Sequence, residues 1–212
     1  MFNSAFLVKL LFLVTTQLTL PPSKPTKKTS TTNQVRINAG VWRSRLLKFP
    51  DVDGLRPTPE RVRITVFNWL GQDLTGKTCL DLFAGTGAFG FEALSRSAKN
   101  VTMVENSHVA YQSLLQNQVL LKAENCQILN QDVLLFLAQN SQIFAQKFDV
   151  IFCDPPYNKA WLEKLLPILN QHLSQEGMLY VEAEFEIKAD AAWQVIKQNK
   201  AGNVYYHLLK SS

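Results

Sequence analysis

The chain has 212 residues, of which 46% are hydrophobic and 10% aromatic, and its formal net charge is +5. A chain of this size and composition can bury a substantial core, so it does not depend on disulfides or a structural metal to fold. No CxxC pair is present, and the odd number of cysteines predicts small buried residues in a reducing compartment, at Cys79, Cys126 and Cys153.

Residues 1–33 are interpreted as an extension that is first hydrophobic and then basic. The apolar run 10–14 resembles part of a signal sequence, but Lys9 interrupts the stretch and no Ala-x-Ala cleavage site precedes Pro21-Pro22. A membrane span needs about 20 apolar residues, which is longer than this run. Residues 21–34 are rich in Thr, Ser, Pro and Lys and predict a flexible basic linker. We therefore expect neither an export signal nor a membrane anchor in this segment.

Residues 34–71 are predicted to form a basic arm that binds RNA. Residues 1–63 hold 11 lysines and arginines against three acids, whereas the remaining residues hold 11 against 14. Positive charge gathered at one end of an otherwise mildly acidic chain is typical of a module that contacts phosphates. A solvated charged face is the structural alternative. The candidate contacts are the cations of this stretch: Arg36, Arg43, Arg45, Lys48, Arg56, Arg61 and Arg63.

Four aromatic residues lie among these cations. They either stack on unpaired bases or pack the arm onto the rest of the protein. For Phe67 and Trp69, the helical spacing from neighbouring apolar residues favours core packing. For Trp42 and Phe49 both possibilities stay open.

The main domain is predicted to span 72–212, and its first strand runs into the glycine turn Gly85-x-Gly87-x-x-Gly90. A strand, a glycine turn and a helix form a nucleotide-binding unit, because glycines let the backbone approach a ligand closely. A second strand, 100–105, ends in Glu105, 20 residues beyond Gly85, where a carboxylate can accept from both ribose hydroxyls. A dehydrogenase shows the same features, so these residues alone leave the reaction open.

The remaining elements alternate between helix and strand, which predicts a doubly wound α/β sheet with ligands at the carboxyl ends of its strands. The last two strands are expected to form an antiparallel pair. Helices are predicted over 89–97, 109–122, 133–138 and 161–173, and strands over 126–130, 149–153, 177–181, 195–196 and 204–209.

The most informative stretch is an apolar strand that ends in Asp154-Pro155-Pro156-Tyr157. Two prolines prevent the strand from continuing and a helix from starting at once. The Asp154 carboxylate and the Pro155 carbonyl are expected to project from the strand's carboxyl end, with the Tyr157 ring beside them. Two acceptors and a ring suit a planar base with an exocyclic NH2, whereas a Pro-Pro turn with a locally capping Asp is the plain alternative. No hydride transfer needs an amine-binding tip, so S-adenosyl-L-methionine together with a base amine explains both motifs.

Residues 34–210 also resemble a known family. The stretches 81–90, Glu105 and 154–157 are similar to the class I, amino-directed methyltransferases. More narrowly, four segments resemble the bacterial small-subunit ribosomal RNA methyltransferase D family. They are Val35-Arg36-Ile37, Gly40-Val41-Trp42-Arg43, Gly54-Leu55-Arg56-Pro57-Thr58 and the helix 61–70. Departures from the family pattern stand at Ala39-Gly40, Asn106 and Tyr157, where Gly-Gly, Asp and Phe are usual.

The resemblance implies a Rossmann-like class I methyltransferase sheet with an N-terminal β-hairpin and helix arm. It also implies catalytic roles for Asp154, Pro155, Pro156 and Tyr157. For Asp132 it implies a position near the adenine of the cofactor, and an N-cap of the following helix is an alternative that is compatible with it. The residues expected to bind S-adenosyl-L-methionine are Asp81, Phe83, Ala84, Gly85, Thr86, Gly87, Glu105 and Asp132.

The function implied by the family is methylation of N2 of guanine 966 in 16S ribosomal RNA. Adenine-N6 methylation of RNA or DNA is a second enzyme hypothesis, because Asp-Pro-Pro-Tyr is common among adenine methylases. A noncatalytic RNA-binding or assembly protein is a third. We expect a cytoplasmic monomer that acts on 16S RNA within an assembling small subunit, without a metal and without a membrane.

Overall fold

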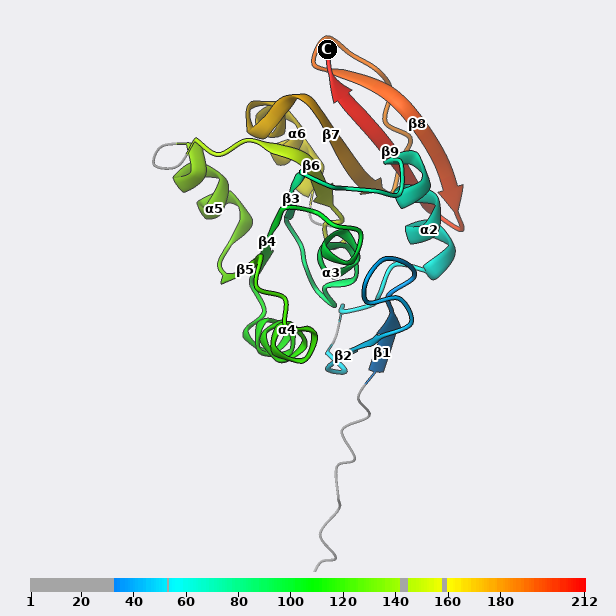
Figure 1. Cartoon of the computed structure of the whole chain (residues 1–212). Helices are drawn as coiled ribbons and strands as arrows, with labels where there is room; N and C mark the ends of the chain where they lie inside the picture. Colours follow the sequence, from blue (N-terminus) through cyan, green and yellow to red (C-terminus); the bar gives the residue numbers. More distant parts are fainter. Residues whose placement is uncertain (1–32, 53, 142–144, 158–159) are drawn as a thin grey trace, which may run out of the picture.

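The computed structural model describes residues 33–52, 54–141, 145–157 and 160–212, and residues 1–32 of the expected extension lie outside these ranges. A seven-stranded sheet in the order β5-β4-β3-β6-β7-β9-β8 forms the centre of the molecule (Figure 1). Its strands pair in parallel from β5 to β7, and β9 runs antiparallel to both β7 and β8. The predicted α/β sheet and its antiparallel closing pair are thus confirmed. The strands are β3 (Thr78–Asp81), β4 (Asn100–Glu105), β5 (Cys126–Asn130), β6 (Phe148–Cys153), β7 (Leu173–Ala183), β8 (Trp193–Ala201) and β9 (Val204–Ser211).

The strand of this sheet that comes first along the chain, β3, lies inside the sheet between β4 and β6. The chain continues outward through β4 and β5 on one side of β3, and then returns to place β6 on the other side. In such a doubly wound sheet the crevice at the carboxyl ends of the strands, where the order reverses, is the usual ligand site. The loops that follow β3 and β6 therefore meet at the place where a ligand is expected.

Helices cover both faces of the sheet, and two hydrophobic clusters lie beneath them (Figure 1). Neighbouring strand residues point to opposite faces, so Cys79 belongs to one cluster and Leu80 to the other. The first cluster lies under α2 (Glu60–Trp69), α3 (Ala88–Ser95) and α4 (His108–Leu121). The second lies under α5 (Val133–Gln139) and α6 (Trp161–Leu169). The three cysteines are buried and free, as predicted.

The arm begins with a hairpin of β1 (Asn33–Arg36) and β2 (Leu46–Phe49), continues into α2 and packs onto the same cluster as α3 and α4. Gly40 lies where the hairpin touches α3, with φ of +81°, and a Cβ placed there would come within 1.7 Å of the Ser95 carbonyl oxygen. The arm backbone can approach the helix this closely only because this residue is glycine. Phe67 is fully buried, which confirms its predicted packing role.

A buried acid fixes the arm to α3. One oxygen of Glu92 accepts from the Asn38 N–H at 2.6 Å, and the other accepts from the Ala39 N–H at 3.0 Å. The same carboxylate lies 2.9 Å from the guanidinium of Arg96 and 3.7 Å from that of Arg63. The arm is therefore held by backbone and ionic contacts as well as by apolar packing.

The assignment of Arg63 to RNA binding was wrong. Arg63 is only 1% exposed. Its guanidinium donates to the carbonyls of Thr58 and Arg36 and lies close to the Glu92 carboxylate. Burial lowers the pKa of Arg63, while the neighbouring Glu92 carboxylate opposes that shift. The Arg63 guanidinium makes these contacts within the arm and to α3, and it is not accessible to a phosphate.

Most predicted elements match the structure to within about two residues. The larger differences lie around β7 and at β8, where the strand expected over 195–196 spans Trp193–Ala201. The helix expected over 161–173 ends at Leu169 and continues as the short 3-10 helix η2 (Asn170–His172), because Leu173 already pairs with β6. The strand expected from Gly177 begins at Leu173, and the register with β6 shifts between these two positions. Among the described residues, no helix is long and apolar enough to cross a membrane.

Candidate active site

The glycine turn follows β3 directly and is anchored to both neighbouring strands. The Leu82 N–H donates to the Phe152 carbonyl of β6, and the Ala84 N–H donates to the Val104 carbonyl of β4, each at 3.0 Å. Gly87 precedes α3 with φ of +76°, and a Cβ there would come within 2.6 Å of the Phe91 ring. The turn can take this path only with glycine, because any Cβ at this position would collide with the packed side chains of the core.

Glu105 ends β4 and binds the glycine turn. Its carboxylate accepts from the Gly85 N–H at 2.8 Å and from the Ser107 N–H at 2.7 Å. A carboxylate has about four lone-pair sites, so these two bonds leave acceptor capacity for a ligand hydroxyl. The structure thus brings together Glu105 and the turn, whose spacing in the sequence suggested a common nucleotide site.

Other residues expected at the cofactor have structural roles of their own. Asp81 is buried and accepts from the Gly90 N–H at 3.1 Å, and burial raises its pKa to about 7. Asp132 caps α5 by accepting from two backbone N–H groups, which confirms the N-cap alternative. The Phe83 ring packs edge-on against Trp161 with centroids 5.3 Å apart. Ala84 and Thr86 are buried in the turn. Their contact with a cofactor stays a prediction.

Asp154 lies immediately after β6, at the sheet edge where the glycine turn also lies. Its carboxylate is partly buried and accepts from the Thr58 hydroxyl of the arm at 2.9 Å. Burial raises the pKa of Asp154 to about 6, while the Thr58 hydrogen bond opposes the shift. Thr58 was not predicted as a site residue, because its hydroxyl reaches Asp154 only through the fold, from 96 positions earlier in the chain.

The buried pair of Glu182 and Tyr180 also lies at this edge of the sheet, and neither residue was predicted from the sequence as part of the site. Glu182 lies near the end of β7 and is 5% exposed, and its carboxylate accepts from the buried Tyr180 hydroxyl at 2.6 Å. Burial, with the nearby charge of Asp154, raises the pKa of Glu182 to about 8. A carboxyl-terminal acid on the strand beside β6 was a signal that could have identified Glu182, because parallel strands end at the same edge.

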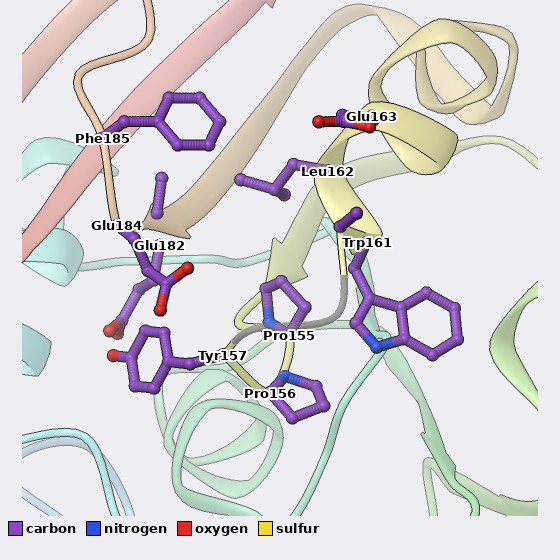
Figure 2. Close-up of a pocket in the computed structure, with 11 residues that line it drawn as sticks. Pro155, Pro156, Tyr157, Trp161, Leu162, Glu163, Glu182, Glu184 and Phe185 are labelled. Carbon is purple, nitrogen blue, oxygen red and sulfur yellow. The ribbon is translucent and has the colours of Figure 1, made fainter.

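A hollow opens to solvent beside these residues (Figure 2). The Tyr157 ring lies at the side of this hollow, with 46% of the residue exposed. Partial burial and, to a smaller extent, the charge of Asp154 raise the pKa of the Tyr157 hydroxyl, which therefore stays protonated. Across the hollow, Phe185 is 53% exposed. The lining combines prolines, aromatic rings and carboxylates: Pro155, Pro156, Tyr157, Ala160, Trp161, Leu162, Glu163, Glu182, Ala183, Glu184 and Phe185.

The remaining arm cations are exposed. Arg36 and Arg45 each donate one hydrogen bond to a backbone carbonyl, of Ser44 and Leu120 respectively, and their residues stay exposed. The predicted phosphate contacts of the arm stay predictions, without Arg63: Arg36, Arg43, Arg45, Lys48, Arg56 and Arg61. Within the described ranges, no group of three or more His, Cys, Asp or Glu residues is placed to hold a metal ion.

Comparisons with known proteins agree with this geometry. Residues 35–210 match the family model described as Conserved hypothetical protein 95. The chain is 41% identical over 184 residues to Ribosomal RNA small subunit methyltransferase D of Escherichia coli, covering 84% of this chain and 91% of that protein. The Haemophilus influenzae protein of the same name is 39% identical over 194 residues, covering 87% of this chain and all of that protein. The solved structure of the Escherichia coli methyltransferase yhhF superposes with a TM-score of 0.74 at 40% identity, covering 84% of this chain and 98% of that chain.

Proposed function

Because the chain belongs to the ribosomal RNA small subunit methyltransferase D family, we propose that it methylates the exocyclic N2 of guanine 966 in 16S ribosomal RNA. One observation supports this proposal above the others. The Asp-Pro-Pro-Tyr motif after β6 and the glycine turn after β3 lie at the same edge of the sheet, because these two strands are neighbours. A methyl donor and a base amine can therefore meet there.

S-adenosyl-L-methionine supplies an activated methyl group. The glycine turn would hold such a ligand, because Gly85 and Gly87 take positive φ and let the backbone approach a bound molecule closely. Glu105 would accept from the ribose hydroxyls with the lone pairs that the Gly85 and Ser107 N–H groups leave free. Asp132 would lie near the adenine, in addition to its capping of α5.

The target amine needs orientation more than it needs a strong base. The N2 lone pair is delocalised into the guanine ring, which makes the nitrogen a poor nucleophile. Accepting its two hydrogens at the Asp154 carboxylate and the Pro155 carbonyl would draw the nitrogen toward tetrahedral geometry and direct its lone pair at the methyl group. Alignment supplies much of the rate, and the fixed acceptors stabilise the positive charge that develops on nitrogen.

The ring of Tyr157 would hold the target base. Its exposure at the side of the hollow leaves a flat face for stacking, and an aromatic ring can keep a base out of its helix or loop. Pro156 fixes the backbone between the acceptors and this ring, since proline restricts φ. After transfer, the ammonium is acidic enough to lose its proton to water, so Asp154 need not be the formal base.

The arm would bind the phosphates around the target. Its exposed arginines lie on the hairpin, on α2 and in the loop that joins them, outside the hollow, where they can neutralise RNA without competing for the base. The proposal also includes a cytoplasmic monomer that acts on an assembling small subunit.

Nucleoside mass spectrometry of 16S RNA from cells with and without the gene tests the proposed function. Loss of N2-methylguanosine is the expected result, and complementation with Asp154→Ala should not restore it. Loss of N6-methyladenosine instead would favour the adenine hypothesis. No change in either nucleoside would favour a noncatalytic role.

A further inference from the structure

Glu182 is a buried carboxylate that the proposed chemistry does not use. Cys153 of β6 lies opposite Val181 of β7, so the residues that follow them, Asp154 and Glu182, come side by side at the edge of the sheet. Glu182 also lines the hollow together with Pro155 and Tyr157 (Figure 2). Two carboxylates side by side in a nearly buried place cost free energy when no ligand donates hydrogen bonds to them. A bound base with two donors would offset this cost.

One oxygen of Glu182 is already committed. Oε1 accepts from the Tyr180 hydroxyl at 2.6 Å, and Tyr180 is fully buried, so this bond fixes the orientation of the carboxylate. The Thr58 hydroxyl also lies close to the Glu182 carboxylate, but its one hydrogen is donated to Asp154, so Oε2 keeps acceptor capacity for a base. An ordered second acceptor therefore stands beside the group that would bind the target amine.

We propose that Glu182 selects guanine by accepting the N1–H that neighbours the reacting N2 amine, an inference that rests on the proposed function. Guanine presents two donors side by side on this edge, the N2 amine and N1–H. In adenine, the nitrogen next to the reacting N6 amine is N1, which carries no hydrogen and is itself an acceptor. A carboxylate facing N1 attracts guanine and repels adenine, because the two acceptors cannot share a hydrogen. Flipped bases are read in this way along their Watson–Crick edge.

The base 2-aminopurine isolates this contact. It carries the same exocyclic 2-amine as guanine, but its N1 has no hydrogen, and it lacks the O6 oxygen. The wild-type enzyme should therefore methylate RNA with guanine at the target at least about tenfold faster than RNA with 2-aminopurine, since an unpaired buried polar group costs about 1 to 3 kcal/mol. Burial, with the nearby charge of Asp154, raises the pKa of Glu182 to about 8, so the assay is run above that pH, where the carboxylate only accepts.

Glu182→Gln should weaken or reverse this preference. The buried Tyr180 hydroxyl needs an acceptor, so the carbonyl of the new amide takes the place of Oε1 and its NH2 faces the base. That NH2 opposes the N1–H of guanine and can donate to N1 of 2-aminopurine. The rate on guanine should fall about tenfold or more, and the guanine to 2-aminopurine ratio should approach or cross one. Tyr180→Phe frees the carboxylate and should lower the ratio without reversing it.

Glu186→Gln is the matched control, because it removes the same charge from an exposed position on the same segment, outside the hollow. It should keep the wild-type ratio, and unchanged S-adenosyl-L-methionine affinity should show that each variant is folded. The same ratio in the wild type and Glu182→Gln, with guanine still methylated, would overturn this inference and leave the proposed function standing. Methylation of an adenine substrate alone by the wild type would overturn both.

Discussion

The hydrogen bond from Thr58 to Asp154 links the arm directly to the amine acceptor, and Thr58→Val tests it. The substitution keeps the branched shape and removes only the hydroxyl that donates at 2.9 Å. Thr58 is 9% exposed, so water has little access to replace the lost donor. A hydrogen bond to a charged group contributes about 1.5 to 3 kcal/mol. If this bond serves to orient the carboxylate, kcat should fall by roughly 10- to 150-fold.

The same variant should change the pH dependence. Asp154 must be ionised to accept the amine hydrogens, and burial places its pKa at about 6, so kcat/KM should fall as the pH falls through that value. The Thr58 hydrogen bond lowers this pKa. Its removal raises the pKa, and the acidic limb of the profile should therefore move to higher pH in Thr58→Val.

Methyl transfer to 16S RNA, measured as kcat and as kcat/KM against pH, checks both expectations. Thr65→Val is the matched control, since its hydroxyl donates to the Arg61 carbonyl within α2 at 2.8 Å and lies away from the site. The control should behave like the wild type. A Thr58→Val enzyme with the wild-type rate and an unmoved acidic limb would show that the hydroxyl does not orient Asp154.

Three further predictions concern cofactor, base and RNA. Glu105→Ala should weaken S-adenosyl-L-methionine binding about tenfold or more through lost charge-assisted hydrogen bonds; calorimetry that finds unchanged affinity in a folded variant would remove Glu105 from the site. Tyr157→Phe should keep methyl transfer and Tyr157→Ala should lose it, because stacking needs only the ring, and equal inactivity in an RNA methylation assay would give the hydroxyl a role. Alanine at three arm arginines should weaken RNA binding and flatten its salt dependence by about 0.7 to 0.9 log units per lost contact. The replaced residues are Arg43, Arg45 and Arg56, and affinity titrations against salt test the expectation. If this variant bound RNA like the wild type while a chain that lacks residues 1–33 failed to bind, the arm hypothesis would be contradicted.

The parts of the site that the sequence predicted are those that depend on local pattern. The glycine turn follows an apolar strand and starts a helix, and this order is visible in ten or so neighbouring residues. Asp154 follows a buried strand and is stopped by two prolines, which is equally local. Because parallel strands of such a sheet end at one edge, the joint position of Glu105 and Asp154 followed from the fold class alone.

The parts that could not be predicted depend on partners far away in the chain. Arg63 looked like its exposed neighbours in composition, and only Glu92 in another helix shows that it is buried. Thr58 finds its acceptor on β6, and Glu182 becomes a neighbour of Asp154 only through the register of β6 and β7. Side-chain burial and pairing of this kind are set by tertiary packing, which spacing in the sequence does not encode.

The contacts of Glu92 imply that the arm is a fixed part of the active site. Its two oxygens serve two backbone N–H groups of the hairpin, and its charge is balanced by Arg63 of α2 and by Arg96. Detachment of the arm would leave Glu92 paired with Arg96 alone, and it would remove two hydrogen bonds to a charged group, each of which contributes about 1.5 to 3 kcal/mol. The arm is therefore expected to stay docked. Thr58, whose carbonyl accepts from Arg63, is thereby held in place against Asp154. RNA bound to the arm would then be aligned with the amine acceptor, because the ionic contacts of Glu92 with Arg63 and Arg96 keep the arm in place.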